Sequence, residues 1–228
     1  MNILVLGRGK TGSQVAEVAR IRGHKVEVLG AAENPEAKAL TATTLSGIDA
    51  AIDFTAASCV LTHIEACVKA GKNMVVGTTG WYGEIDRVRK LVESQRTGLI
   101  YAANFSIGVS IFLEAAKAAA AALGRDYIGQ IFERHHAHKK DAPSGTALVL
   151  QQVMGAAGGA GKDLEIISFR EGEVVGMHEV VLESDVDRIY LCHDAKSRRG
   201  FAEGAVRAAE WVAGKSGFYD FKDVWREL

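Results

Sequence analysis

The sequence predicts an α/β protein in which a Rossmann-like, doubly wound parallel sheet is followed by a second, α+β domain with a mixed or antiparallel sheet. Three observations support this prediction. Strand-length apolar runs alternate with helical patterns over the first hundred residues, a glycine-rich loop separates the first strand from the first helix, and the alternation ends after residue 107. Repeated strand–helix–strand units require right-handed crossovers, which place helices on both faces of a parallel sheet.

The first domain is expected to contain five strands connected by helices. The strand-like runs are Asn2–Leu6, Lys25–Leu29, Ala50–Phe54, Asn73–Val76 and Gly98–Ala102, and the helical patterns cover Thr11–Arg22, Cys59–Ala70 and Glu84–Ser94. Ligands of doubly wound folds bind at the carboxyl ends of the strands. The loops that follow these strands are therefore the expected position of a nucleotide site.

The second domain is expected to begin with a long helix and one strand, followed by a basic loop. The helix covers Ile107–Leu123, the strand lies near Tyr127–Glu133, and another helix begins near Ser144. Further strands are expected at Leu164–Arg170, Glu179–Glu183 and Arg188–Cys192, and the absence of helical patterns between them indicates an antiparallel or mixed sheet. We interpret Gly155–Gly161 as a flexible loop, and Phe201–Ala213 as a last helix that periodicity assigns to neither domain.

The composition argues against several classes of function. Of the 228 residues, 48% are hydrophobic, and 27 lysines and arginines balance 28 acidic residues. Such a chain has no overall basic field for nucleic acid or an anionic membrane, so we expect a small ligand instead. The N-terminal residues lack the pattern of a secretory leader, which gives the expectation of a cytoplasmic protein. Glu114 and Lys117 interrupt the most apolar stretch, 111–123, so no membrane span is expected.

The three cysteines, Cys59, Cys67 and Cys192, are odd in number and show neither a CxxC spacing nor a disulfide framework. We expect them to act as small buried hydrophobic residues.

The motif Gly7-Arg8-Gly9-Lys10-Thr11-Gly12 lies between the first strand and the first helix and has the GxGxxG spacing. Glycines allow the backbone to approach a pyrophosphate, and the helix N-terminus offers unpaired N–H groups and a partial positive charge. A plain tight turn is the alternative. The strand–loop–helix context favours a site for NADH or NADPH.

The choice between these two cofactors stays open at this stage. The second strand ends Val28-Leu29-Gly30-Ala31, without the acidic residue that usually holds the adenosine ribose hydroxyls. Glu27 and Glu33 are the candidate substitutes, although Glu27 alternates with valines and fits a solvent-facing position. Arg8 and Lys10 fit contacts to a 2′-phosphate instead.

Two further segments are candidates for the cofactor site because they follow the fourth and fifth strands. Gly77-Thr78-Thr79-Gly80 offers small residues and hydroxyls for a nicotinamide ribose, with a simple turn as the alternative. Ala102-Ala103-Asn104-Phe105 offers an amide and an aromatic ring, and Phe105 fits a core position equally well.

The basic loop after the second domain's first strand holds three histidines and two lysines within six positions: His135, His136, His138, Lys139 and Lys140. No cysteine or carboxylate stands near them at a favoured ligand spacing and the lysines repel a divalent cation, so we expect no metal. A solvated basic loop is the second alternative. Histidine titrates near neutral pH and lysine donates protons, so a proton-transfer site is favoured.

The residues that follow this loop support an anion pocket. Pro143-Ser144-Gly145-Thr146 precedes an apolar helical run, and small residues at a helix start expose N–H groups and hydroxyls that hold a carboxylate. A cofactor would supply hydride, while the protein orients the substrate, neutralises its charge and delivers a proton.

Taken together, these motifs resemble the dihydrodipicolinate reductase family over nearly the whole chain. The matching segments occur in the family's order and at similar separations: Gly7–Gly12, Asp53–Thr55, Gly77–Gly80, Ala102–Val109 and His135–Ala147. The resemblance implies NAD(P)H-dependent reduction of 4-hydroxy-tetrahydrodipicolinate, a small cyclic dicarboxylate, to tetrahydrodipicolinate with loss of water. This reaction belongs to bacterial diaminopimelate and lysine biosynthesis.

The resemblance also implies roles for individual residues. His135 matches the proton donor or acceptor and Lys139 a proton donor, while His136, Gly145 and Thr146 match substrate-binding positions, to which Ser144 is added from the helix-start argument. The segments 7–12, 77–79 and 102–105 match those that hold the dinucleotide.

The family's organisation implies a dinucleotide-binding domain of residues 1–106 and 199–228, and a substrate-binding and oligomerisation domain of residues 107–198. It also implies a homotetramer formed through the second domain's sheet. Two departures concern the cofactor: the glycine loop is one residue shorter than in some members, and alanine occupies the usual acidic position after the second strand.

Two other functions are compatible with the scaffold. An aspartate-type amino-acid dehydrogenase would join similar domains and bind a dicarboxylate, but it does not account for the dense histidine–lysine block. A non-enzymatic dinucleotide sensor would leave the proton-transfer side chains unexplained.

Overall fold

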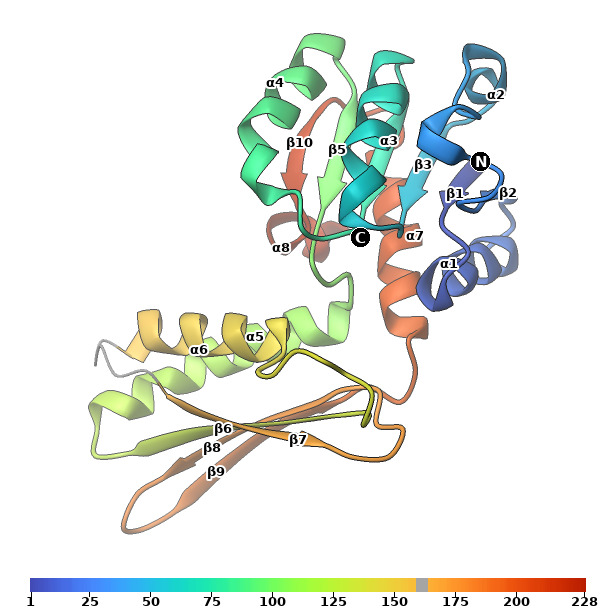
Figure 1. Cartoon of the computed structure of the whole chain (residues 1–228). Coiled ribbons are helices and arrows are strands. Elements are labelled where there is room, and N and C mark those ends of the chain that lie inside the picture. The colour runs from blue at the N-terminus through green and yellow to red at the C-terminus, as the bar shows by residue number, and fades with distance from the viewer. Residues whose placement is uncertain (159–163) are drawn as a thin grey trace. The chain divides into compact units, whose positions relative to one another are not determined.

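The computed structural model describes residues 1–158 and 164–228, and the chain divides into two compact units (Figure 1). Unit 1 comprises Met1–Ser106 and Arg199–Leu228, and unit 2 comprises Ile107–Arg198. The last helix, which periodicity does not assign, is therefore part of unit 1.

Unit 1 is built on a six-stranded parallel sheet with the strand order β10-β5-β4-β3-β1-β2. Its strands are β1 (Asn2–Leu6), β2 (Lys25–Leu29), β3 (Ala50–Asp53), β4 (Asn73–Val76), β5 (Gly98–Tyr101) and β10 (Gly217–Asp220). The chain runs from β1 to β2 on one side and then crosses back to β3 on the other side of β1. The strand order therefore reverses at β1, as in doubly wound folds. The sequence analysis missed β10, because four residues with two aromatic rings give no periodicity to read.

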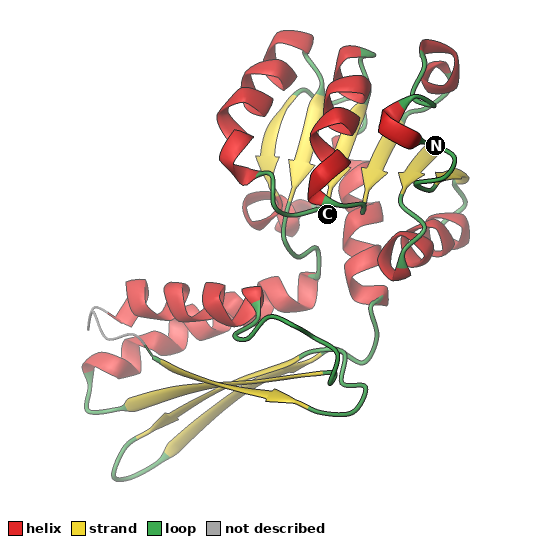
Figure 2. Ribbon diagram, viewed as in Figure 1, coloured by secondary structure: helices red, strands yellow, loops and turns green. Residues whose placement is uncertain are grey.

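Helices cover both faces of this sheet (Figure 2). The longer ones are α1 (Lys10–Ile21), α3 (Ala57–Lys69), α4 (Ile85–Gln95) and α7 (Arg199–Val212). Short helical turns complete the unit: η1 (Pro35–Ala37), α2 (Ala42–Ser46), η2 (Tyr82–Glu84), α8 (Phe221–Val224) and η4 (Trp225–Glu227). Helix α1 packs on α7, and α3 packs on α4.

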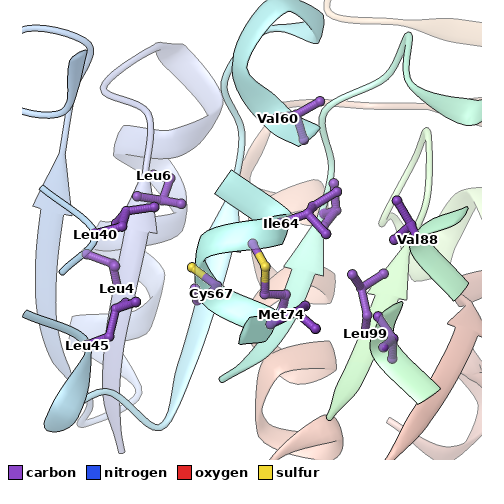
Figure 3. Packing of buried hydrophobic residues seen from close by; sticks show 14 of the residues in the cluster. Leu4, Leu6, Leu40, Leu45, Val60, Ile64, Cys67, Met74, Val88 and Leu99 are labelled. Carbon is purple, nitrogen blue, oxygen red and sulfur yellow. The ribbon is translucent and has the colours of Figure 1, made fainter. Parts of the chain in front are cut away.

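The alternation of side chains along each strand divides the core of unit 1 into two layers. Leu4 and Leu6 of β1 lie in one cluster with Ile64 of α3 and Val88 of α4, as Figure 3 shows. The opposite face is covered by α7, since the amide of Asn73 donates to the carbonyl of Val212, the last residue of that helix. Burial on both faces explains why the inner strands β1, β3, β4 and β5 are largely apolar, whereas the edge strand β2 alternates exposed and half-buried residues.

Unit 2 contains a four-stranded mixed sheet with the order β7-β6-β8-β9. Its elements are α5 (Ile107–Ala119), η3 (Ala120–Gly124), β6 (Ile128–His135), α6 (Gly145–Gly158), β7 (Glu165–Arg170), β8 (Met177–Glu183) and β9 (Arg188–Asp194). Strands β6 and β7 are parallel, and the other pairs are antiparallel. Helices α5 and α6 cover one face of this sheet, where Phe112 and Leu150 pack against Ile131 and Val180. The predicted α/β plus α+β fold class is confirmed.

The interpretation of Gly155–Gly161 as a loop is wrong for its first four residues, which form the end of α6. Glycine costs about 1 kcal/mol in a helix, but close helix packing requires it here. A Cβ on Gly158 would lie 2.9 Å from a side-chain carbon of Leu123 and 3.2 Å from the carbonyl oxygen of Ala120. Residues 159–161 of the segment lie outside the described residues.

The cysteines differ in burial. Cys67 is buried, Cys59 is half-buried, and Cys192 on the edge strand β9 is exposed, so the expected burial is wrong for Cys192. The stretch Ile107–Gly124 meets the length and composition of a membrane-crossing helix, which is weak evidence because core helices meet the same test. Phe112, Ala116 and Ala120 of this stretch pack on the mixed sheet.

Candidate active site

The glycine loop of unit 1 has a backbone that only glycine allows. Gly7 has a φ of +109°, and a Cβ there would lie 2.2 Å from the carbonyl oxygen of Phe54. A Cβ on Gly12 would lie 2.2 Å from the carbonyl oxygen of Gly7. Gly9, the N-cap of α1, has nothing within 4 Å of a Cβ position. The start of α1 therefore presents N–H groups behind an uncovered backbone, which fits a pyrophosphate.

A cavity of about 450 Å³ lies beside this loop, at the carboxyl ends of β1, β2 and β3. Glu33 reaches back to the end of β2, where its Oε2 accepts a hydrogen bond from the N–H of Gly30 at 2.9 Å. Nε of Arg8 lies 3.2 Å from Oε1 of Glu33, and the Arg8 guanidinium also donates to the carbonyl of Val28 at 3.0 Å. Backbone N–H groups and the Arg8 guanidinium lower the pKa of Glu33. Glu33 thus brings a carboxylate to the end of β2, where the usual acidic position of the sequence is occupied by alanine. Glu27 is exposed on β2 and does not line the cavity.

A buried carboxylate in contact with residues that line this cavity connects three loops. Asp53, at the end of β3, is fully buried, and its Oδ1 accepts hydrogen bonds from the hydroxyls of Thr55 at 2.7 Å and Thr78 at 2.6 Å. Its Oδ2 lies 2.7 Å from Nδ1 of His63, and Nε2 of His63 lies 3.2 Å from the amide nitrogen of Asn34. The segments after β2, β3 and β4 are therefore held by one network.

A second cavity, of about 480 Å³, has the glycine loop on one side and residues 77–80 on the other. Lys10, Thr11, Thr78 and Thr79 line it, so the structure brings two of the predicted cofactor segments together. Gly77 is required at this place, because a Cβ there would lie 2.2 Å from the ring of Phe54.

The third predicted segment, residues 102–105, uses its aromatic ring and its amide side chain for contacts within the protein. Phe105 is only 1% exposed, and its ring packs against those of Phe54 and Phe221 at centroid distances of 6.1 and 4.8 Å. Oδ1 of Asn104 accepts a hydrogen bond from the N–H of Ser106 at 2.8 Å. The Phe105 ring is thus part of the core, and Ala103 is the exposed residue of the segment.

The basic loop of unit 2 begins with a buried carboxylate–imidazole contact at the end of β6. Glu133 and His135 point to the same side of this strand, and the carboxylate of Glu133 contacts Nδ1 of His135. The other carboxylate oxygen accepts a hydrogen bond from Arg170 of β7 at 2.8 Å. Burial raises the pKa of Glu133, but hydrogen bonds from Arg170 and Ser168 outweigh burial and lower the pKa overall. Glu133 is therefore an ionised carboxylate beside the imidazole.

The remaining residues of the loop lie closer to solvent. His136 and Lys139 are half-buried, whereas His138 and Lys140 are exposed. Nζ of Lys139 lies 2.8 and 2.7 Å from the two carboxylate oxygens of Asp141, and this contact lowers the pKa of Asp141. The ammonium group is thus held at the turn that leads to α6.

At the start of α6, the hydroxyl of Ser144 is buried, whereas the next residue, Gly145, is exposed. Ser144 is 2% exposed, and its Oγ lies 3.0 Å from Nε2 of His178 and accepts a hydrogen bond from the N–H of Ala147 at 3.3 Å. Gly145 is exposed and Thr146 half-buried. The Ser144 side chain therefore fixes the helix start, and Gly145 and Thr146 form the part of that start that reaches the surface.

The sequence analysis missed three members of this cluster. Glu133 was available from the alternation of β6, where a carboxylate occupies an inward-facing position two residues before His135. Arg170 and His178 come from β7 and β8 and become neighbours only through strand pairing.

Ligating atoms of Glu133, His135 and His178 lie within 4.8 Å of one another, a spacing compatible with a metal ion. Two of these atoms already bind each other, and Arg170 supplies positive charge to the same carboxylate. The positive charge of Arg170 on the same carboxylate disfavours a cation here, and the absence of a metal stays a prediction.

Unit 1 thus combines the parallel sheet, glycine loop and paired cavities of a dinucleotide-binding domain, and unit 2 carries a cluster of histidine, lysine and carboxylate side chains, groups of the kind that transfer protons. These features define the class of nicotinamide-dependent oxidoreductases.

The family models agree with this class and narrow it. The model described as "Dihydrodipicolinate reductase, N-terminus" matches residues 1–105, and the model described as "Dihydrodipicolinate reductase, C-terminus" matches residues 108–225. The chain belongs to the dihydrodipicolinate reductase family.

Curated relatives and solved structures give the same picture. A protein of Christiangramia forsetii named 4-hydroxy-tetrahydrodipicolinate reductase is 37% identical over 240 residues, which cover 100% of this chain and 99% of that protein. A protein of the same name from Neisseria meningitidis is 38% identical over 202 residues, covering 80% of this chain and 74% of that protein. The dipicolinate-bound dihydrodipicolinate reductase of Paenisporosarcina sp. TG-14 has a TM-score of 0.81 at 23% identity, covering 98% and 99% of the two chains. The resemblance inferred from the motifs is confirmed.

Proposed function

We propose that this chain reduces 4-hydroxy-tetrahydrodipicolinate to tetrahydrodipicolinate, with loss of water, in the cytoplasmic pathway to diaminopimelate and lysine. A bound NADH or NADPH supplies the hydride. The observation that carries the proposal is the Glu133–His135 pair, which shares its loop with Lys139 and with the exposed start of α6. The curated relatives of the chain are named for this reaction.

In this proposal, His135 and Lys139 move protons to and from the substrate. Burial lowers the pKa of His135 while Glu133 raises it. The protonation of the ring therefore depends on the balance between burial and the neighbouring carboxylate. The Lys139 ammonium, held by Asp141, is a proton donor at the edge of the same loop. General acid–base groups of this kind contribute roughly 10²–10⁴-fold to turnover.

The start of α6 binds a substrate carboxylate in this proposal. Gly145 and Thr146 offer the backbone N–H groups and hydroxyl, His136 adds a polar ring, and Ser144 holds the turn from below. The loop's positive charges neutralise the dicarboxylate.

Unit 1 binds the dinucleotide in this proposal, through Gly7, Arg8, Gly9, Lys10, Thr11 and Gly12 at the pyrophosphate and through Gly77, Thr78, Thr79, Ala102, Ala103, Asn104 and Phe105 at the nicotinamide end. The first set fits because its backbone is uncovered at Gly9, and the second because residues 77–80 face the glycine loop across a cavity. Phe105 would contribute through its backbone, since its ring is buried.

The direct test follows the absorbance of NADH and of NADPH while the unstable substrate is generated from pyruvate and aspartate semialdehyde by the preceding synthase. Rapid oxidation that requires both the synthase and this chain supports the proposal. No oxidation by folded protein that binds dinucleotide would overturn it. Aspartate-dependent NAD⁺ reduction would then indicate an amino-acid dehydrogenase, and tight binding without turnover a sensor.

The roles of the two proton-transfer residues are tested by His135→Ala and Lys139→Ala. Each variant is expected to lower kcat by roughly 10²–10⁴-fold. Lys140→Ala is the matched control, because Lys140 is exposed in the same loop. Unchanged turnover in both His135→Ala and Lys139→Ala would refute the assigned roles.

We also propose that unit 2 forms a homotetramer through the sheet face that its helices leave uncovered. Phe132, Ile167, Phe169, Val181 and Tyr190 occupy this face by strand register, and Phe169 and Tyr190 are 36% and 56% exposed. These side chains share the face with charged ones such as Glu179 and Arg188, and aromatic side chains exposed among polar groups are typical of a subunit interface. Phe169→Glu is expected to reduce the mass measured by light scattering, with Val186→Glu, at an exposed turn, as the control.

A further inference from the structure

Two carboxylate oxygens of Glu133 are shared between an arginine and a histidine. Glu133 is fully buried, and its Oε1 accepts a hydrogen bond from Arg170 at 2.8 Å while its Oε2 contacts Nδ1 of His135. The guanidinium of Arg170 also donates to the carbonyl of Asp141 at 2.6 Å. The carboxylate therefore has its position fixed from the side opposite to His135.

This contact determines which nitrogen of His135 exchanges a proton. An ionised carboxylate only accepts hydrogen bonds, so Nδ1 carries a hydrogen in both the neutral and the charged ring. Nε2 is the nitrogen whose protonation changes. It lies against Gly176, where a Cβ would be only 3.0 Å away, so a side chain at residue 176 would press on this nitrogen.

We propose that Glu133, fixed by Arg170, is a positioning residue for the reduction: by binding Nδ1 of His135 it makes Nε2 the nitrogen that exchanges a proton with the substrate. The inference rests on the proposed function of His135. It adds a residue that touches neither substrate nor cofactor.

The other titratable groups around His135 act on its pKa in opposite directions. Burial lowers the pKa of His135, Glu133 raises it, and Lys139 and Arg170 lower it. His178 of β8 lies beside it, with ring centroids 5.2 Å apart. Burial lowers the pKa of His178 to about 4, so this neighbour is neutral at neutral pH, and His193 of β9 acts on it in the same direction. Glu133 is thus the single group among these that favours the imidazolium of His135.

The proposal is tested first on the protein without ligands, by following the ring protons of His135 in an NMR titration. Glu133→Gln is expected to lower the pKa of His135 by about one pH unit or more, because it removes an opposite charge in contact with the ring. Arg170→Met is expected to raise this pKa, because it removes a like charge. Glu171→Gln is the matched control, since Glu171 is exposed and pairs with Arg134.

Opposite shifts in Glu133→Gln and Arg170→Met separate positioning from general loss of structure, which would move both variants in one direction. Shifts of the same sign, or a His135 titration that Glu133→Gln leaves unchanged, would overturn the proposal. Glu133→Asp retains the negative charge but holds it farther from the ring, so it is expected to leave the pKa of His135 between those of wild type and Glu133→Gln.

The pH profile of kcat/KM then separates this inference from the proposed function. The limb that reports His135 is expected to move to lower pH in Glu133→Gln, whether His135 acts as acid or base. A shifted NMR titration with an unshifted profile would refute the catalytic role of His135 and leave the Glu133 contact intact. A His135-dependent activity with an unshifted NMR titration would refute the positioning role alone.

The assignment of Nε2 has its own test in Gly176→Ala, which places a methyl group against this nitrogen. We expect kcat to fall at least tenfold with little change in thermal stability. Gly155→Ala is the control, because Gly155 of α6 has nothing within 4 Å of a Cβ position. Wild-type kcat in Gly176→Ala would show that Nε2 is not the exchanging nitrogen.

Discussion

Nδ1 of His63 lies 2.7 Å from Oδ2 of Asp53, and both side chains are buried in the larger unit, where His63 lines the cavity beside the glycine loop. The side-chain amide of Asn34 determines which ring nitrogen of His63 carries the hydrogen. Oδ1 of Asn34 accepts the N–H of Ala39 at 3.0 Å, so its NH₂ group faces Nε2 of His63 and donates to it. The Nδ1–H of His63 thus donates to Asp53, and the pair connects the loop after β2 with those after β3 and β4.

Asp53→Asn is expected to weaken dinucleotide binding by about tenfold and to destabilise unit 1 by about 1–3 kcal/mol, since an amide NH₂ cannot accept the bonds that Asp53 accepts. Isothermal titration with NADH and thermal denaturation measure the two effects. Asp49→Asn, at the exposed amino end of β3, is the control. Unchanged affinity in a destabilised Asp53→Asn variant would mean that the network only supports the fold.

The Arg8–Glu33 pair is expected to set the cofactor preference. Glu33 places a carboxylate at the end of β2, where it would accept a ribose hydroxyl and repel a 2′-phosphate, while the adjacent Arg8 would attract that phosphate. Glu33→Ala should therefore raise the affinity for NADPH relative to NADH by about tenfold, and Arg8→Ala should lower it.

Equilibrium binding of both cofactors, followed by protein fluorescence, measures this ratio. Glu27→Ala is the control, because Glu27 is an exposed acidic residue of β2 that does not contact Arg8 or Gly30 through any hydrogen bond or ion pair found among the described residues. If Glu27→Ala changes the ratio and Glu33→Ala does not, the acidic position has been assigned to the wrong residue.

Most of the fold could be predicted because it depends on local patterns. Four of the six strands in unit 1, β1, β3, β4 and β5, are largely apolar runs buried on both faces, the edge strand β2 alternates apolar and charged residues, and the glycine loop is a contiguous motif. The strand β10 escaped prediction because it is a short edge strand, and residues 155–158 because helix packing overrides glycine's low propensity.

The site was predictable only where its residues are contiguous. The block from His135 to Thr146 and the loops 7–12 and 77–80 were found by sequence, but the partners of His135 were not. Arg170 and His178 depend on strand register, and Glu33 reaches its place through a turn that carries it back to Gly30. Such relationships have no fixed spacing along the chain.

Gly204 of α7 is expected to tolerate no side chain. A Cβ there would lie 1.7 Å from the carbonyl oxygen of Phe105, so this close approach of helix and loop requires glycine. Gly204→Ala should destabilise the protein by at least about 1–3 kcal/mol, the cost of overpacking. Thermal denaturation is the measurement. Gly155→Ala, which meets no neighbour, should instead leave stability unchanged or raise it by about 0.5–1 kcal/mol.

His178 is expected to make stability fall in mild acid. Its pKa is about 4 in the folded protein against an ordinary 6.5, mainly because it is buried. Between these two values the unfolded chain binds a proton that the folded protein does not, so the free energy of unfolding falls as pH drops from 6.5 to 4 and the loss is complete below 4. The difference corresponds to about 3 kcal/mol.

Urea denaturation at pH 7, 6, 5 and 4 measures this dependence. His178→Gln should reduce the loss of stability between pH 7 and pH 4 by about 3 kcal/mol relative to wild type. A remaining loss is expected from His135 and His193, whose pKa values burial also lowers. His138→Gln changes an exposed histidine of the same unit and should retain the wild-type dependence. If His178→Gln retains it as well, His178 does not resist protonation in the folded protein, and the charge balance assigned to His135 must be revised with it.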